Sequence, residues 1–349
     1  MTPLKTRLPI YLPDATRGVV KSLDTNDLLN CGVEGVVVNT LHLAETPGLD
    51  YLRKIGGVKK LMGFEGLVVS DSGGWQLFSL IHRSNSQGSI TNDGVFFKNG
   101  TNRKNIFTPE DSISSQFDIG SDILICLDDF TPPNSNSLRE RESVERTILW
   151  AQRCKAEFER QVDKRSLSDT SLPLLFSVIQ GGFDRKLRAQ CASELIAIGF
   201  DGYGYGGYAV TENGLDLELS KFVADLIPND KYKFALGSGT LSDIANLAGY
   251  GWQIFDCTLP TRDARHGRLY IYNSALNFPA EYVYIERSKF SEDQSPIDDT
   301  CDCHTCKNFT KSYLHHLFKI KDFTAYRLAT IHNLRCYTRL TEFLRKPSI

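Results

Sequence analysis

The stretch LLFSVIQGGFDRKLRAQCASELIAIGFDGYGYGG, residues 174–207, contains three local patterns in succession. An apolar run over 174–180 predicts a buried strand, the amphipathic segment 186–198 predicts a helix, and the run over 202–207 predicts a second strand. A strand, a helix and a strand in this order are typical of a parallel βαβ unit. The stretch therefore predicts a protein of the α/β class.

The same alternation extends in both directions along the chain, with helical patterns such as Val144–Arg160 between the apolar runs. The runs are Pro9–Leu12, Gly35–Asn39, Gly66–Asp71, Ile123–Asp128, Leu174–Gln180, Gly202–Gly207, Phe234–Gly239 and Ile254–Asp256. Eight strand–helix units over about 250 residues predict one (β/α)8 TIM barrel. A doubly wound open sheet is the alternative, although no glycine-rich dinucleotide fingerprint follows the first run.

The composition excludes several classes of protein. With 349 residues, 41% hydrophobic and 23% charged, the chain is neither disordered nor collagen-like. Its net charge of −2 means that a nucleic-acid site must be a local basic patch. No apolar run approaches the ~18 residues of a membrane span, and no signal peptide is recognisable. Most cysteines are scattered singly, as in reduced proteins, so we expect a cytoplasmic protein.

Two regions interrupt the strand–helix rhythm. The segment from Arg83 to Thr108 is rich in Asn and Gly and predicts a hairpin inserted in a βα loop. Near residue 278 the pattern changes, so we expect a barrel region over 1–277 and a separate subdomain with closing helices over 278–349, which holds the cysteine cluster described below. Within the second region, Ser288–Asp299 is polar and acidic, which predicts a linker.

Polar residues and glycines stand at or near the ends of the apolar runs. They are Asn39, Asp71, Asp128, Gln180, Gly207, Gly237 and Asp256. In a barrel the carboxyl ends of all strands meet at one mouth, so these residues should surround one pocket. A single Asp after a strand is usually a helix cap. Three carboxylates and two carboxamides at equivalent positions instead predict a functional site.

A cluster of three cysteines, Cys301, Cys303 and Cys306, predicts a metal site. Three thiolates and one imidazole suit tetrahedral zinc, and a site with all four positions filled is structural. A disulfide or three unliganded thiols is the alternative. Spacing alone leaves the fourth ligand open among His304, His315, His316 and His332.

Six features together resemble the tRNA-guanine transglycosylase family. They are VNTLHL (38–43), SDSGGWQ (70–76), QGG (180–182), GGYAV (206–210), FDCTLPTR (255–262) and the cysteine cluster with His332. The resemblance runs from about residue 8 to 340 and implies a zinc-bearing (β/α)8 barrel, with His332 as the fourth ligand. It also implies exchange of the wobble guanine of a tRNA anticodon for a 7-deazaguanine.

The resemblance assigns the chemistry to two carboxylates. Asp256 matches the nucleophile that attacks C1′ of the ribose, and Asp71 matches the general acid/base. Holding the ribose covalently lets one base replace another without hydrolysis, and two inversions give net retention. The structural alternative for each residue is a cap at the end of a strand.

The resemblance also assigns substrate contacts. Asp128 matches the reader of the N1–H and N2–H2 donors of guanine, and Gln180 and the backbone of Gly207 match donors to O6. Trp75 and Leu236 match apolar walls, with core packing as the alternative for both.

Contacts with the tRNA anticodon stem-loop fall on Thr261, Arg262 and Arg265, directly after the proposed nucleophile. A solvated basic loop is the alternative. Val210, the last residue of GGYAV, is stiff and should narrow the pocket, and Glu212, two residues further on, could meet a cation. We therefore expect preQ1 to be favoured, with queuine possible as the incoming base.

Two other functions agree with the same resemblance. One is a non-catalytic partner subunit that keeps zinc, which the presence of both Asp71 and Asp256 argues against. The other is a relative that modifies guanine in DNA. Catalytic members of the family form dimers, either with themselves or with such a partner subunit, so we expect a dimer. A homodimer is the prediction, and a heterodimer is the alternative.

Overall fold

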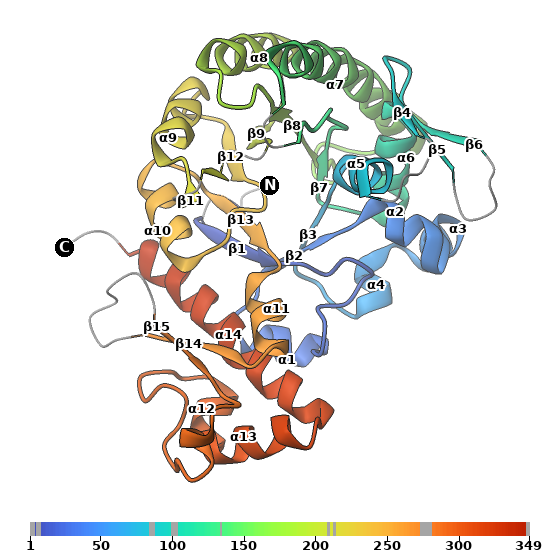
Figure 1. Cartoon of the computed structure of the whole chain (residues 1–349). Coiled ribbons are helices and arrows are strands. Elements are labelled where there is room, and N and C mark those ends of the chain that lie inside the picture. The colour runs from blue at the N-terminus through green and yellow to red at the C-terminus, as the bar shows by residue number, and fades with distance from the viewer. Residues whose placement is uncertain are drawn as a thin grey trace.

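The computed structural model describes residues 4, 8–83, 88–98, 104–132, 135–207, 210–211, 214–272 and 281–346. All eight predicted strands are present and parallel, in the order β1-β13-β12-β9-β8-β7-β3-β2 (Figure 1). They are β1 Ile10–Pro13, β2 Gly35–Val38, β3 Leu67–Ser70, β7 Ile123–Ile125, β8 Leu174–Ile179, β9 Gly202–Tyr205, β12 Tyr232–Ala235 and β13 Ile254–Cys257. A bridge between Asp14 and Val37 joins the two ends of the sheet, so the predicted α/β barrel is confirmed.

Helices surround the barrel. They are α1 Thr25–Asn30, α2 Thr40–Leu43, α3 Leu49–Ile55, α4 Val58–Met62, α5 Gly74–Arg83, α6 Pro109–Ile119, α7 Ser137–Arg165, α8 Arg185–Ile198, α9 Leu217–Leu226, α10 Leu241–Gly249 and α11 Leu259–Arg265. A π-turn at Ala44–Gly48 links α2 to α3. Helix α7 is longer than the predicted Val144–Arg160, because Asn136 caps it two turns earlier, where residues 137–142 are polar or charged apart from Leu138 and are half-buried or exposed.

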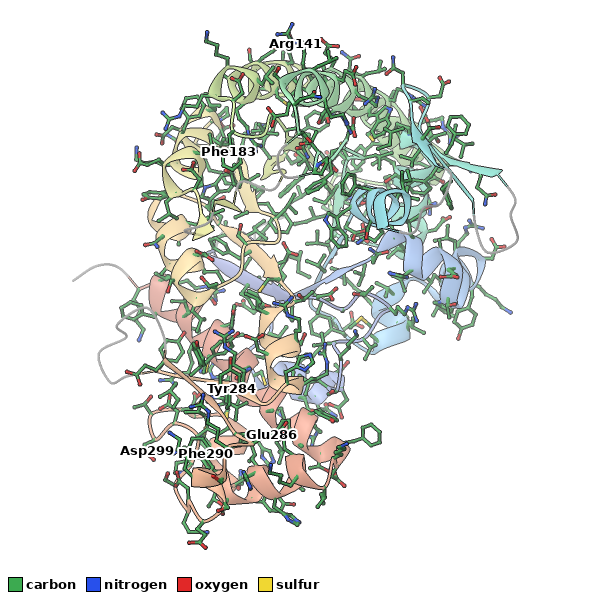
Figure 2. All side chains as sticks on the ribbon, viewed as in Figure 1. Arg141, Phe183, Tyr284, Glu286, Phe290 and Asp299 are labelled. Carbon is green, nitrogen blue, oxygen red and sulfur yellow. The ribbon has the colours of Figure 1, made fainter. Side chains whose placement is uncertain are left out.

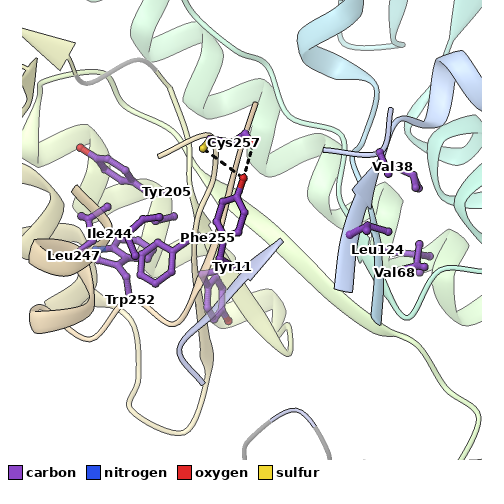
Figure 3. Close-up of a cluster of buried hydrophobic side chains, with 14 of the residues drawn as sticks. Tyr11, Val38, Val68, Leu124, Tyr205, Ile244, Leu247, Trp252, Phe255 and Cys257 are labelled. Atoms are coloured by element: carbon purple, nitrogen blue, oxygen red, sulfur yellow. Dashed lines mark hydrogen bonds between the residues drawn. The ribbon is translucent and has the colours of Figure 1, made fainter. Parts of the chain in front are cut away.

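Alternation along the strands separates two hydrophobic clusters. Ile10 and Leu12 of β1 point into the barrel, where they meet side chains of the other strands. Tyr11, between them, points outward to the layer between barrel and helices. Figure 3 shows this outer layer, including Tyr11, Leu124 and Phe255. Both sides of each strand are thus buried, which explains why the runs are almost continuously apolar.

The insertion after α5 forms a small antiparallel sheet at one side of the barrel (Figure 1). Its strands are β4 Ser89–Ile90, β5 Val95–Lys98 and β6 Lys104–Phe107. The predicted hairpin is confirmed by the pairing of β5 with β6. A second ribbon, β10 Val210–Thr211 with β11 Gly214–Leu215, follows β9.

The C-terminal region has its own hydrophobic core below the barrel (Figure 1). Its elements are β14 Arg268–Ile271, β15 Glu281–Tyr284, a 3-10 turn Ser288–Phe290, α12 His304–Asn308, α13 Lys311–Lys319 and α14 Phe323–Leu344. The linker predicted at 288–299 is wrong, because Phe290 and Ile297 are buried in this core. Figure 2 shows Phe290 in this region, near Tyr284 and Glu286.

Helix α14 joins the C-terminal region to the barrel. The Arg327 guanidinium binds both carboxylate oxygens of Asp27, at 2.8 and 2.6 Å, and so ties α14 to α1. The same helix packs against α10, α11 and β1. The division into 1–277 and 278–349 therefore stays a prediction. Within the described residues, none of the helices is long and apolar enough to cross a membrane.

Candidate active site and metal centre

The mouth of the barrel is built by one simple rule. Side chains alternate along a strand, so a residue two positions beyond an inward-pointing one points the same way, at the mouth. Five residues singled out from the sequence follow an inward residue of the barrel cluster at this spacing. The pairs are Val37 and Asn39, Val69 and Asp71, Val178 and Gln180, Phe234 and Leu236, and Ile254 and Asp256.

Asp71 lies in a cage of N–H donors. Its Oδ2 accepts from Asn39 Nδ2 at 2.8 Å and from Gln76 Nε2 at 3.1 Å. Its Oδ1 accepts from the backbone N–H groups of Thr40 and Gly73, both at 3.1 Å. Burial raises the pKa of Asp71 to about 6, although all four bonds lower it. The group can therefore hold or release a proton near neutral pH.

Asp256 has fewer partners. The backbone N–H of Gly237 donates to its Oδ1 at 2.8 Å. The pKa of Asp256 is raised to about 7, mainly by burial and also by the negative charges of Asp14 and Asp71, against the lowering effect of the Gly237 hydrogen bond. Its carboxylate is thus poorly solvated and lies close enough to Asp71 to feel its charge.

Asp128 and Gln180 form a pair across two neighbouring strand ends. Gln180 Nε2 donates to Asp128 Oδ2 at 2.6 Å, and Ser72 Oγ is 3.4 Å from Asp128 Oδ1. Burial raises the pKa of Asp128 to about 6. Gln180 Oε1 is buried and has no hydrogen-bond partner in the described part of the chain. Gly207 has φ +78°, and a Cβ there would lie 3.1 Å from that oxygen, so glycine keeps this corner open.

The two apolar candidates lie at different depths. Trp75, in the first turn of α5, is 49% exposed and is therefore not a core residue. Leu236 follows β12 and packs against the barrel interior, half-buried. Both positions border the strand ends that carry the polar groups.

Sequence reasoning missed a buried ion-pair cluster behind Asp128. Asp129 is 1% exposed, and its carboxylate binds the guanidinium groups of Arg139, at 2.6 and 2.8 Å, and of Arg146. Both arginines come from α7. These ion pairs fix the segment that carries Asp128. Only the tertiary structure brings Asp129 and the two arginines together. Asp14, at the end of β1, is a further carboxylate that the sequence analysis did not single out.

The three predicted tRNA contacts lie on α11, directly after β13. The side chain of Arg262 is 54% exposed. Arg265 is partly buried, and its Nη1 donates to the Thr261 carbonyl at 2.7 Å. Thr261 is 4% exposed, and its hydroxyl donates to the Thr258 carbonyl at 3.2 Å. Of the three, Arg262 is therefore the most accessible side chain.

The predicted metal ligands come together. One ligand atom from each of Cys301, Cys303, Cys306 and His332 lies within 4.8 Å of the others. His332 Nδ1 is 3.2 Å from Cys306 Sγ, and Nε2 donates to the Tyr270 carbonyl at 2.6 Å. That bond leaves the Nδ1 lone pair facing the thiols, the arrangement of a metal-binding histidine. Three sulfurs and one nitrogen fit zinc.

The other histidines considered as the fourth ligand point elsewhere. His304 and His316 are exposed, and His315 Nδ1 donates to the Ile285 carbonyl at 2.8 Å. The structure therefore selects His332.

Comparison with known proteins agrees with this geometry. A family model described as queuine tRNA-ribosyltransferase matches residues 2–347. The chain is 36% identical over 340 residues to the queuine tRNA-ribosyltransferase of Solidesulfovibrio magneticus. The aligned region covers 97% of this chain and 86% of the relative. The enzymes of Francisella tularensis subspecies holarctica and novicida are 38% identical over 340 residues, covering 97% of this chain and 87% of each relative.

Proposed function

Because the chain belongs to the queuine tRNA-ribosyltransferase family and is thus a pentosyltransferase, we propose that it exchanges the wobble guanine of a tRNA anticodon for a 7-deazaguanine through a covalent aspartyl–ribose intermediate. The observation that carries this proposal is the meeting of Asp71 and Asp256 at one mouth. They come from strands far apart in the sequence, and the charge of Asp71 raises the pKa of Asp256.

In the first step, a carboxylate oxygen of Asp256 attacks C1′ of the ribose. The C1′–N9 bond breaks, its electron pair leaves with guanine, and Asp71 supplies the proton that the departing base needs. A poorly solvated carboxylate with one backbone donor suits the nucleophile. A carboxyl group whose pKa is about 6 suits the acid.

In the second step, the incoming base gives its N9 proton to Asp71 and attacks C1′. The bond between C1′ and Asp256 breaks, and the nucleophile returns as a carboxylate. Each step inverts C1′, so the product keeps the configuration of the substrate.

Recognition of the base falls to the Asp128–Gln180 pair. The Asp128 carboxylate accepts from the N1–H and N2–H2 groups of guanine, and Gln180 and the Gly207 N–H donate to O6. Gln180 has two amide protons, and the bond to Asp128 uses one of them. Trp75 and Leu236 enclose the faces of the base.

The metal site has a structural role in this proposal. Cys301, Cys303, Cys306 and His332 would hold zinc, which would crosslink α12 and α14. Asn333, next to His332, donates to the carbonyls of Pro260 at 3.2 Å and Arg268 at 2.9 Å.

A zinc-anchored α14 thereby supports α11, where Thr261, Arg262 and Arg265 meet the anticodon stem-loop. The four ligands leave no position for a catalytic water.

We propose preQ1 as the favoured base and a homodimer as the assembly. The argument for preQ1 rests on the stiff side chain of Val210. That side chain, and the residues Tyr208, Ala209 and Glu212, lie outside the part of the chain that the structure describes.

Exchange of labelled guanine into unmodified tRNA, compared with duplex DNA, tests the function. We expect incorporation into tRNA alone, and Asp71→Asn should block it because an amide cannot exchange the proton. Incorporation into DNA would indicate a DNA-modifying relative. No exchange by zinc-loaded protein would indicate a non-catalytic partner subunit.

A further inference from the structure

One carboxylate at the mouth has no role in the mechanism above. Asp14 directly follows β1, two residues after the inward-pointing Leu12, so its side chain belongs on the inner side of the rim. In the register of β1 with β13, Leu12 pairs with Asp256. On the other side, Asp14 bridges Val37 of β2. Asp14 thus directly follows β1. This strand lies between β13, which carries the proposed nucleophile, and β2, which leads to Asn39.

The Asp14 carboxylate keeps unused acceptor capacity. Thr16 Oγ1 lies 2.7 and 2.8 Å from its two oxygens, but a hydroxyl has one proton to share between them. Among the residues that the structure describes, no arginine, lysine or histidine forms an ion pair with Asp14. A half-buried carboxylate with one shared donor has room for donors from a ligand.

The charge of Asp14 is felt inside the site. It raises the pKa of Asp256, and it acts on the guanidinium of Arg265 in α11. Asp14 therefore lies near both the attacking carboxylate and Arg265, one of the residues proposed to bind tRNA, and the ribose must sit beside that carboxylate.

We infer that Asp14 accepts a hydrogen bond from the 2′-hydroxyl of the nucleotide whose base is exchanged, and so selects RNA over DNA at that position. This inference rests on the proposed function. Neighbouring strands are about 4.8 Å apart, a spacing that one ribose can span. C1′ would face Asp256, and O2′, on the next carbon, would face Asp14.

The same contact would favour the reaction itself. Positive charge develops at C1′ as the bond to the base breaks, which makes the 2′-hydroxyl a better donor. Hydrogen bonds to this hydroxyl strengthen in the transition states of retaining glycosidases. The 2′-hydroxyl is also the group that distinguishes RNA from DNA. Thr16 is a positioning residue, since its hydroxyl orients the carboxylate.

Two anticodon stem-loop RNAs that differ only in guanosine or 2′-deoxyguanosine at the wobble position test the inference. With zinc-loaded wild-type enzyme, we expect kcat/KM for guanine exchange to be about 10- to 100-fold higher on the ribose substrate, the value of a hydrogen bond to a charged group. Asp14→Val should reduce this ratio at least tenfold. Asp14→Asn should retain a larger ratio than Asp14→Val, because the amide oxygen still accepts.

The outcomes separate this inference from the proposed function. A wild-type ratio near one would overturn the inference, whatever the variants do. An unchanged ratio in folded Asp14→Val would also overturn it, and would indicate that Asp14 acts only through its charge on Asp256. No exchange on either substrate would instead contradict the proposed function. Thr16→Val should lower the ratio by less than Asp14→Val does.

Discussion

The metal centre and the mouth of the barrel both bury polar side chains, but they satisfy them in different ways. In the metal centre, the thiols and His332 face one another, and the outer nitrogen of His332 is bonded to the Tyr270 carbonyl. At the mouth, Asp256 accepts from one backbone N–H, and Gln180 Oε1 and Gln76 Oε1 have no partner in the described part of the chain.

This difference separates stability from function. Buried groups that all bind one metal ion contribute to folding stability. Buried polar groups that lack hydrogen-bond partners instead lower stability until a substrate supplies those partners. The raised pKa values of Asp128 and Asp256 reflect that cost. Removing a group at the mouth should therefore abolish activity and spare the fold. Removing a metal ligand should first destabilise the fold, and activity should be lost as a consequence.

The largest effect is expected at the nucleophile. Asp256→Asn should lower exchange by about 10⁴-fold or more, because the amide cannot form the ester to C1′. Wild-type enzyme mixed with tRNA, without an incoming base, should give a denaturation-resistant adduct on a gel. The variant should give none and keep its zinc.

Asp50→Asn is a matched control, since the Asp50 side chain is 98% exposed on α3. It should behave as wild type. An adduct in Asp256→Asn would identify a different nucleophile.

The metal centre should respond in stability. Cys303→Ser should lose zinc and lower the melting temperature by more than about 5 °C, because bound structural zinc contributes folding free energy. Elemental analysis and thermal unfolding measure both. Cys336→Ala is the control, since Cys336 Sγ is 3.7 Å from His332 Nε2, on the side away from the other thiols. Full zinc in Cys303→Ser would show that the site is not the one described.

Loss of base recognition should be smaller. Asp128→Asn should lower kcat/KM for guanine by about 10- to 100-fold, because a charge-assisted acceptor becomes an amide that faces guanine donors. Steady-state exchange at varied guanine concentration measures the change. An unaltered KM and kcat would mean that the base binds elsewhere.

The pH dependence should separate the two regions further. Activity should fall below about pH 7, because Asp256 must be ionised to attack, and should fall again at higher pH, because Asp71 must hold a proton for the departing guanine. Folding raises the pKa of Asp256 from 3.8 to about 7. The contribution of this group to stability is therefore fully present below pH 3.8 and is lost as the pH rises through about 7. Asp256→Asn should therefore melt a few degrees above wild type near pH 8 and gain less near pH 5. Equal gains at both values would contradict the raised pKa.

The smallest effect concerns the incoming base. Val210→Gly should raise kcat/KM for queuine relative to preQ1 by about tenfold, the lower end of what one methylene is worth in a pocket. Both bases are assayed with wild type and variant. A wild-type enzyme that prefers queuine would show that Val210 does not limit the pocket.

The sequence predicts those parts of the site whose residues are close together in the chain. The positions of Asp71 and Asp256 at strand ends could be predicted, because each apolar run and the polar residue at its end are adjacent in the chain. Asp14 was missed because the first run was ended at Leu12. The linker at 288–299 was wrong because two apolar residues, Phe290 and Ile297, are enough to anchor a polar segment to a small core.

The sequence by itself determined the barrel, the carboxylates at its mouth and the cluster of three cysteines, since periodicity and short spacings are local properties. Only the tertiary structure decided which groups are partners. His332 was chosen by a bond to the carbonyl of Tyr270, and Asp129 was paired with Arg139 and Arg146 of α7. Burial, which raises the pKa values at the mouth, is likewise a sum over neighbours from many strands, and no single segment contains it.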